Sequence, residues 1–99
     1  MLTIDSGPDG TVVISGRLDA AQAASAQAFL DNTRGQVVLD CAALEYLSSA
    51  GLGVLLKTQK RLASADGGLR LVALRPHVRD IFKYSGFDRI FQIEPQPAR

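Results

Sequence analysis

The centre of the chain changes from a strand-like run to a helix-like run at a pair of serines. Residues 36–40 (QVVLD) have a continuous apolar centre, which is typical of a strand covered on both faces in a parallel sheet. Beyond Ser48 and Ser49, apolar residues recur at the spacing of one helix face, at Leu52, Leu55, Leu56 and Leu62. This order predicts a central strand, a loop over residues 41–47 and a helix that begins at the serines.

The flanking segments continue this alternation of strands and helices. Turn formers in residues 6–10 separate two strand-like segments, residues 1–4 and 11–15, which predicts an N-terminal hairpin. Asp19 is expected to cap an alanine-rich helix over residues 20–31. The later elements are predicted as a helix end at a left-handed glycine within residues 66–68, a strand over 69–74, a helix opened by Pro76 and closed by Ser85 and Gly86, and a short strand over 90–93.

These elements together predict an α/β fold class. We expect a single domain with a mixed sheet of four to five strands, an N-terminal hairpin, parallel pairing in the later half and about three to four α-helices. Ninety-nine residues leave room for one core only. The domain is expected to span residues 1–95, with residues 96–99 as a flexible tail.

Composition and charge exclude several classes of function. The formal net charge of +1 gives no broad attraction for nucleic acid. No apolar run reaches the roughly 20 residues that cross a bilayer, and the first residues lack the order of a signal peptide, so we expect no membrane insertion and a cytoplasmic location. Cys41 is expected to be a buried apolar residue, and the single His77 has no second ligand near it. Neither a metal site nor a cofactor is therefore predicted.

The serine pair at the helix start is the candidate functional feature. The first amides of a helix lack intrahelical acceptors and lie at the positive end of the helix dipole, so they can hold a phosphate electrostatically. A phosphoserine adds about −1.5 to −2 charges and three acceptor oxygens. Ser48 and Ser49 are therefore candidates for a regulatory switch, and one of them is also expected to cap the helix.

Several short motifs in a fixed order point to a known family. They are GRLD at residues 16–19, an apolar strand ending in Leu39-Asp40, LEYLSSAGLGVLL at residues 44–56, RPHV at residues 75–78 and YSGF at residues 84–87. Nearly the whole chain thereby resembles the STAS domain family of anti-anti-sigma factors. The resemblance implies an anti-sigma factor antagonist that, when unphosphorylated, sequesters a serine-kinase anti-sigma factor with a GHKL-type ATPase fold. A PP2C-type phosphatase would reverse the phosphorylation.

The resemblance leaves the phosphate acceptor open. When Gly51-Leu52-Gly53 is matched to the family's Gly-Leu-Gly, Ser49 matches the first serine of its loop and Ala50 the second, while Ser48 replaces an aspartate. In sporulation-type members the second serine is the acceptor, and Ala50 cannot carry phosphate. The acceptor is expected to be Ser49, with Ser48 as the second choice and no phosphorylation as the third possibility.

The same loop is expected to bind the partner. The resemblance implies a partner-binding surface made of Asp19, Ser48, Ser49, Ala50, Gly51, Leu52 and Gly53. Gly51 and Gly53 would let another backbone come close. Asp40 is expected to hydrogen-bond the loop, and Lys57, Lys60 and Arg61 form either a contact for an acidic partner or a solvated helix face.

Two other functions compete with this interpretation. A hydrolase elbow of the G-x-S-x-G type would need glycine where Leu47 stands, and a triad would depend on His77, so no enzyme activity is expected. The alternative within the fold is a STAS accessory subunit that is not phosphorylated, as in a lipid-transport ABC ATPase. The sequence identifies neither the sigma factor or other output nor the oligomeric state.

Overall fold

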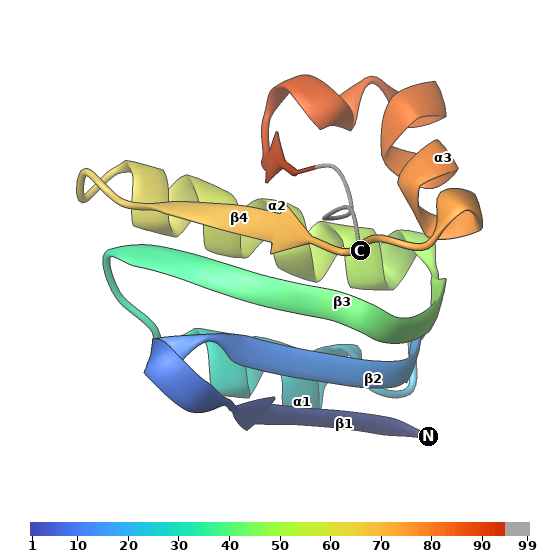
Figure 1. The fold of residues 1–99 in the computed structure, drawn as a ribbon, viewed down its shortest axis with the longest axis horizontal. Coiled ribbons are helices and arrows are strands. Elements are labelled where there is room, and N and C mark those ends of the chain that lie inside the picture. The colour runs from blue at the N-terminus through green and yellow to red at the C-terminus, as the bar shows by residue number, and fades with distance from the viewer. Residues whose placement is uncertain (95–99) are drawn as a thin grey trace.

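A five-stranded mixed sheet forms the framework of the chain, whose computed structural model describes residues 1–94. Its strands lie in sequence order (Figure 1): β1 (Leu2–Ser6), β2 (Val12–Leu18), β3 (Gln36–Leu47), β4 (Gly68–Val72) and β5 (Gln92–Ile93). β1 and β2 pair antiparallel around a short 3-10 turn, η1 (Pro8–Gly10), and every later pairing is parallel. The predicted α/β class, N-terminal hairpin, central strand and parallel later half are confirmed. The predicted tail, residues 96–99, lies outside the described residues.

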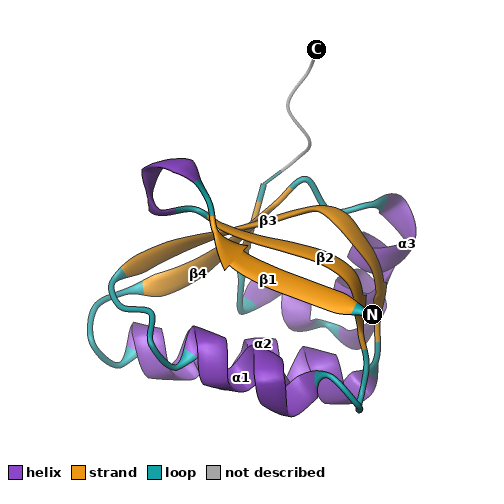
Figure 2. Ribbon diagram, turned by 90° about the horizontal axis from the view of Figure 1, so that it is seen from below, coloured by secondary structure: helices purple, strands orange, loops and turns teal. Residues whose placement is uncertain are grey.

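Helices α1 (Ala23–Leu30) and α2 (Ser49–Ala63) cover one face of this sheet (Figure 2). Along β3, Val37 and Leu39 are fully buried beneath these helices, whereas Val38 and Asp40, which point the other way, are only half-buried. The prediction of a strand covered on both faces was therefore wrong. Parallel pairing does not by itself require helices on both sides when the sheet is this small.

The hydrophobic core lies between the sheet and the helices. Its largest fully buried side chains come from β2, β3, β4, α1, α2 and α3 (Pro76–Ser85), among them Ile14, Leu30, Leu39, Leu55 and Phe82. Thr58 is the one buried polar side chain of the described core, and its hydroxyl donates to the Val54 carbonyl at 2.9 Å. Within residues 1–94, no helix has the length and apolar character needed to cross a membrane.

Strand β3 continues through the residues predicted as a loop. β4 stops pairing with it at Asp40, but β2 remains paired as far as Leu47. Two carbonyl groups of β3 that no longer face β4 are contacted by side chains from the start of α3. Arg75 Nε donates to the Ala42 carbonyl at 3.0 Å, and His77 Nε2 lies 2.6 Å from the Glu45 carbonyl oxygen. Two register shifts in the β2–β3 pairing disturb the alternation of this segment, so its sequence did not resemble a strand.

Two predicted helix ends also differ from the structure. Helix α1 begins at Ala23, after a turn closed by a bond from the Gln22 amide to the Asp19 carbonyl at 3.1 Å, and no side chain caps it. The left-handed residue after α2 is Asp66 (φ 63°), which lies in a helix end closed by a bond from the Gly67 amide to the Leu62 carbonyl at 2.8 Å. Gly67 is needed for another reason, since a Cβ on it would lie 2.2 Å from the Gly35 carbonyl oxygen. Helix α3 does begin at Pro76 and ends at left-handed Gly86, as predicted.

Candidate functional site

The candidate site lies where the carboxyl ends of β2 and β3 meet the beginning of α2, at the right of Figure 1. The Ser48 amide donates to the Leu18 carbonyl at 2.9 Å, and Leu18 pairs with Leu47 at the end of the parallel ladder. This pairing brings Asp19, which follows β2, beside Ser48, which follows β3. The structure thus assembles two distant parts of the predicted partner-binding surface at one edge of the sheet.

Ser48 is the N-cap of α2. Its backbone is extended (φ −84°, ψ 172°), and its Oγ accepts a hydrogen bond from the Gly51 amide at 3.1 Å. Its carbonyl accepts the first intrahelical bond, from the Leu52 amide at 2.8 Å. The side chain is half-buried. The hydroxyl oxygen of Ser48 is therefore already used to satisfy one of the free amides of the helix.

Ser49 is the first residue of α2 and has a different environment. It is exposed, and so is Ala50. Among the described residues, no hydrogen bond involves the Ser49 hydroxyl or the amides of Ser49 and Ala50. The first turn of α2 also contains no acidic side chain that would neutralise the positive end of its dipole. The start of α2 therefore combines free amide donors with an uncompensated positive end of the helix dipole beside the Ser49 hydroxyl.

The two glycines after the serines have separate roles. Gly51 is buried, and a Cβ there would lie 2.6 Å from the Leu18 carbonyl oxygen, so this glycine lets α2 approach β2 closely. Leu52 is 8% exposed and belongs to the core. Gly53 is exposed, and a Cβ on it would have no neighbouring atom within 4 Å. Gly51 and Leu52 therefore support the surface from within, and only Gly53 offers backbone to a partner.

Asp19 lies beside the serines without capping either helix. It is half-buried, and its Oδ1 is buried without a hydrogen-bond partner among the described residues. A buried carboxylate oxygen without a donor is costly, and its presence at this edge of the sheet favours a role in presenting the loop or in binding a partner. The expected role of Asp19 as a helix cap was wrong, because the turn over residues 20–22 separates it from α1.

Of the four other residues proposed as contacts, Asp40 and Arg61 have structural partners elsewhere, and two lysines remain exposed. Asp40 lies in the middle of β3 and accepts a bond from the Ala42 amide at 3.0 Å, so it does not bind the serine loop. Arg61 donates to the Leu30 carbonyl at 2.8 Å at the end of α1, which makes it a link between helices. Lys57 and Lys60 are exposed on α2 and remain available.

Two residues of the site are missed by sequence reasoning. The Arg17 guanidinium carbon lies 4.2 Å from the centroid of the Tyr46 ring, and the two residues are paired in the β2–β3 ladder. The sequence pattern places Tyr46 in a loop, so it gives no reason to set this ring beside Arg17. Had residues 41–47 been assigned to a strand parallel to β2, pairing of the strand ends would have brought these side chains together.

The single cysteine is buried in the core. Burial, with a smaller contribution from the Asp40 charge, raises the pKa of Cys41 to about 12, so its thiol is protonated at neutral pH. The described His, Cys, Asp and Glu residues include no group that could hold a metal ion.

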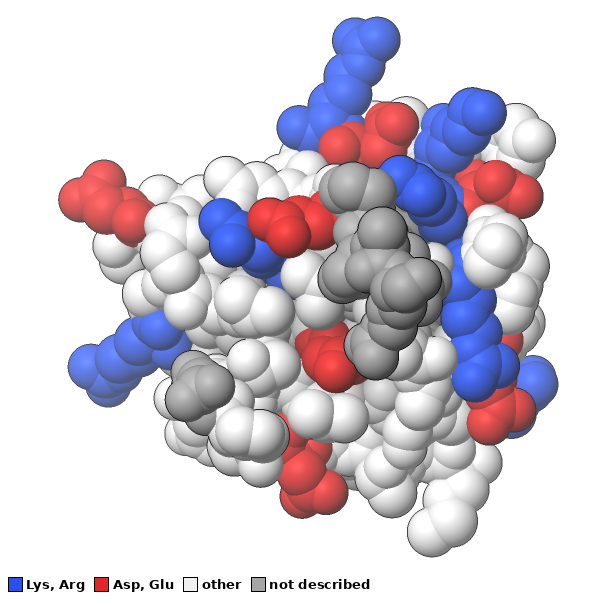
Figure 3. Space-filling model, viewed as in Figure 1, with Lys and Arg blue, Asp and Glu red and all other residues white. Residues whose placement is uncertain are grey.

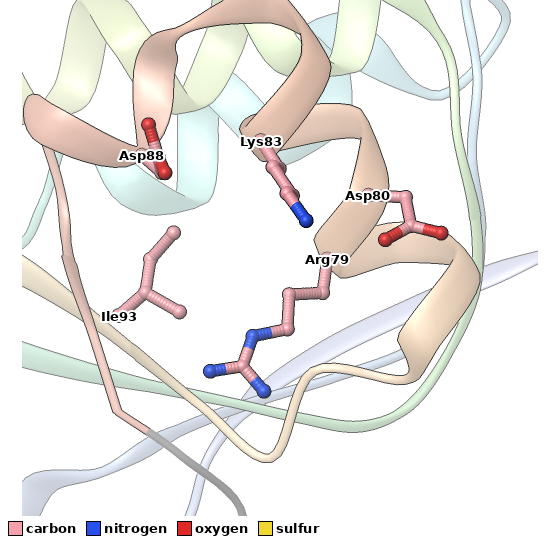
Figure 4. Close-up of a pocket in the computed structure, with 5 residues that line it drawn as sticks. All are labelled: Arg79, Asp80, Lys83, Asp88 and Ile93. Atoms are coloured by element: carbon pink, nitrogen blue, oxygen red, sulfur yellow. The ribbon is translucent and has the colours of Figure 1, made fainter.

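Helix α3 carries several charged side chains away from the serines. Figure 3 shows basic side chains gathered on the side of the molecule where α3 lies, with acidic ones between them. A hollow there is lined by mixed charges (Figure 4), from Arg79, Asp80, Lys83, Asp88 and Ile93. Because the positive and negative groups alternate around it, this hollow has no single preferred ligand charge.

Comparison with known proteins agrees with this geometry. Residues 3–94 match the family model described as "Mlab, STAS domain". A protein of Bordetella bronchiseptica named as the putative anti-sigma factor antagonist BtrV is 41% identical over 98 residues, which cover 93% of this chain and 84% of that protein. The matches extend across the sheet and all three helices, so the similarity includes the whole candidate site.

Solved structures share the arrangement of strands and helices. The crystal structure of an anti-sigma factor antagonist from Mycobacterium paratuberculosis is 28% identical, with a TM-score of 0.75 over 96% of this chain and 86% of that one. SpoIIAA in its unphosphorylated form is 22% identical (TM-score 0.73, covering 96% and 89%). The phosphorylated form of Bacillus SpoIIAA is 21% identical (TM-score 0.67, covering 96% and 92%). At these identities the two SpoIIAA structures support the fold alone.

Proposed function

The chain belongs to the STAS domain family, and from this premise we propose that it is an anti-sigma factor antagonist controlled by phosphorylation of Ser49. In its unphosphorylated form it sequesters a serine-kinase anti-sigma factor with a GHKL-type ATPase fold. Phosphorylation by that kinase releases it, and a PP2C-type phosphatase restores binding. The observation that carries this proposal is the exposed Ser49 at the amino end of α2, beside free amides.

The names of the similar proteins support the proposed role as an anti-sigma factor antagonist. The Bordetella protein is named as a putative anti-sigma factor antagonist, and the Mycobacterium structure is described as one. SpoIIAA, whose fold this chain shares, has been solved in both unphosphorylated and phosphorylated forms. A domain of this shape therefore accommodates phosphate while remaining folded.

We propose that phosphorylation of Ser49 weakens partner binding and leaves the domain itself folded. Within the domain, the amides of Ser49 and Ala50 can donate to the new phosphate oxygens. A partner packed against Ser49, Ala50 and Gly53 would instead have to desolvate or repel a dianion. A loss of about 3 kcal/mol of binding free energy weakens an interaction more than a hundredfold, which is enough for a switch.

Ser48 is the second choice as acceptor, for a structural reason. Its oxygen caps α2 and its side chain is half-buried, so a kinase would have to withdraw the cap to reach it. We propose that Ser48 positions the loop and that Ser49 carries the signal. The partner-binding surface then consists of Asp19, Ser48, Ser49, Ala50 and Gly53, with Gly51 and Leu52 as its support.

The proposal makes the chain a regulatory binding protein without enzyme activity. Its partners are proteins, with no nucleic acid and no membrane insertion involved, and its place of action is the cytoplasm, where kinase, ATP and sigma factor meet. The second candidate is a STAS accessory subunit that is not phosphorylated, for example in a lipid-transport ABC ATPase. Ala50 favours it, because alanine stands where the sporulation-type members of the family carry their acceptor serine.

One experiment separates the two candidates. The purified chain is incubated with ATP and the serine-kinase anti-sigma factor encoded nearest to its gene, and the peptides of residues 36–57 are examined by mass spectrometry. We expect phosphate on Ser49, and none in a Ser49→Ala variant. If this kinase modifies another substrate but leaves residues 36–57 unmodified, the accessory-subunit function replaces the switch.

A further inference from the structure

The stacked pair of Arg17 and Tyr46 is built into the sheet and remains open to solvent. The register shift between Gly16 and Arg17 pairs Arg17 with Tyr46 across the parallel strands β2 and β3. The extra residue of this shift, Glu45, lies on β3. On β2, Gly16 has a left-handed backbone (φ 92°), and the Arg17 amide donates to the Met1 carbonyl at 3.0 Å. Arg17 is exposed, and Tyr46 is 38% exposed although it is a large aromatic side chain.

This pair lies one ladder position before the end of β2 and β3, where Asp19 and the serines follow. The next pair in the ladder is Leu18 with Leu47, and the Leu18 carbonyl accepts the bond from the Ser48 amide. Arg17 therefore precedes Asp19 by two residues, and Tyr46 precedes Ser48 by two residues. Leu18 and Leu47 point toward α2, because a Cβ on Gly51 would lie 2.7 Å and 2.9 Å from their side chains, so Arg17 and Tyr46 point to the helix-free face of the sheet. A protein that covers the amino end of α2 would reach the pair by extending around the carboxyl ends of β2 and β3.

The chemistry of the pair suits recognition of a carboxylate. A guanidinium over an aromatic face gains a cation–π attraction, and its planar fork of N–H groups matches the geometry of a carboxylate. Among the described side chains, the one ion pair joins Arg70 and Glu94, so Arg17 has no carboxylate within 4.0 Å. Arg and Tyr are also among the residue types that most often dominate binding energy at protein interfaces.

We infer that Arg17 and Tyr46 extend the partner-binding surface of this chain and bind an acidic side chain of the anti-sigma factor. This inference rests on the proposed function. The positive end of α2, which has no acidic residue in its first turn, adds to the attraction for an acidic partner. The serines carry the switch, and the Arg17–Tyr46 pair contributes affinity and selects the partner.

A charge-reversal pair of variants tests the inference. Arg17→Glu is compared with Arg34→Glu, which makes the same charge change at an exposed arginine before the start of β3, at the opposite end of the strand. Affinity for the kinase named above is measured by calorimetry. We expect Arg17→Glu to weaken binding about tenfold or more, because like charges would then face each other, and Arg34→Glu to change it less than about twofold.

Two further measurements make the test specific. Arg17→Gln should reduce the salt dependence of the affinity, since screening acts on the charge that it removes. Tyr46→Leu should weaken binding while it keeps the unfolding midpoint in urea close to that of the wild-type chain, because its side chain is partly exposed.

The outcomes distinguish this inference from the proposed function. If the wild-type chain binds and is phosphorylated but the Arg17 and Arg34 variants bind equally well, the inference is overturned and the switch stands. If the wild-type chain does not bind the kinase at all, the proposed function fails and the inference fails with it. Unchanged salt dependence in folded Arg17→Gln likewise contradicts an acidic contact.

Discussion

At the scale of single residues, two adjacent serines have different tasks because their hydroxyls have different surroundings. The Ser48 hydroxyl oxygen accepts a bond from the Gly51 amide at 3.1 Å, whereas the Ser49 side chain is exposed and its hydroxyl makes no hydrogen bond among the described residues. The sequence predicted that one of the pair caps the helix, and the structure assigns that role to Ser48. It also removes Asp19 from the caps and leaves its Oδ1 without a donor.

The first prediction compares the free energies of unfolding of variants at Ser48, the helix cap, and at Ser49, the proposed phosphorylation site. Ser48→Ala should lower the free energy of unfolding by about 1 kcal/mol, because the Gly51 amide loses its acceptor. Ser49→Ala should change it by no more than about 0.5 kcal/mol, since an exposed hydroxyl without partners is removed. Urea denaturation followed by circular dichroism measures both. Equal losses in the two variants would contradict the assignment of the cap.

The second prediction concerns Asp19. Asp19→Ala should leave the free energy of unfolding unchanged within about 0.5 kcal/mol or raise it, because a buried oxygen without a hydrogen bond is removed. The same variant should bind the anti-sigma factor more weakly in calorimetry. A loss of stability above about 1 kcal/mol with unchanged affinity would assign Asp19 a purely structural role.

At the scale of elements, the sequence pattern predicted a strand or helix correctly where apolar spacing and turn residues agree. Examples are the hairpin, β4 and α3, which lies between Pro76 and Gly86. The pattern failed over residues 41–47, because the bulged pairing with β2 places Leu44 and Leu47 in the core at a spacing that is not that of a regular strand. It also failed at the turn after α2, where Asp66 has the positive φ and Gly67 is required instead by its close contact with Gly35. In both places the backbone conformation depends on contacts between segments that are distant in the sequence, so the local residue pattern does not predict it.

The third prediction belongs to helix α2. Gly53 is exposed inside the helix with open space around its missing Cβ, so Gly53→Ala should raise the free energy of unfolding by about 0.5–1 kcal/mol. The added methyl should nevertheless weaken binding of the anti-sigma factor, because it stands on the surface where the partner backbone approaches. Ser25→Ala, at an exposed position of α1 that is not part of the proposed partner-binding surface, serves as the control. Stabilisation with full affinity would exclude Gly53 from the interface.

At the scale of the whole molecule, the candidate site is a product of topology. Because β2 and β3 are parallel, the residues that follow them lie at the same edge of the sheet. The family resemblance places Asp19 and the serines on one surface. The Arg17–Tyr46 pair could not be anticipated, since it depends on the register of a strand that the sequence did not reveal. Gly51 and Leu52 were assigned to the surface because sequence alone does not show which side of a helix start faces its own strand.

The fourth prediction follows from the burial of Cys41 in the shared core. Burial raises its pKa from 9.0 to about 12, so the folded chain keeps the thiol proton at pH values where the unfolded chain loses it. The stability contributed by the neutral thiol is complete below about pH 9 and declines as the pH rises toward 12. Urea midpoints measured between pH 8 and about pH 10 should fall more for the wild-type chain than for Cys41→Ala. Parallel pH dependence in both chains would contradict the buried thiol.

The switch is tested most directly by comparing the chain with and without phosphate on Ser49. Phosphoserine is incorporated at position 49 during translation, so the comparison does not depend on a kinase, and both forms are titrated into the anti-sigma factor by calorimetry. We expect both forms to keep the same fold by NMR and the phosphorylated form to bind at least about a hundredfold more weakly. Equal affinity of the two forms would contradict the proposal that Ser49 is the switch.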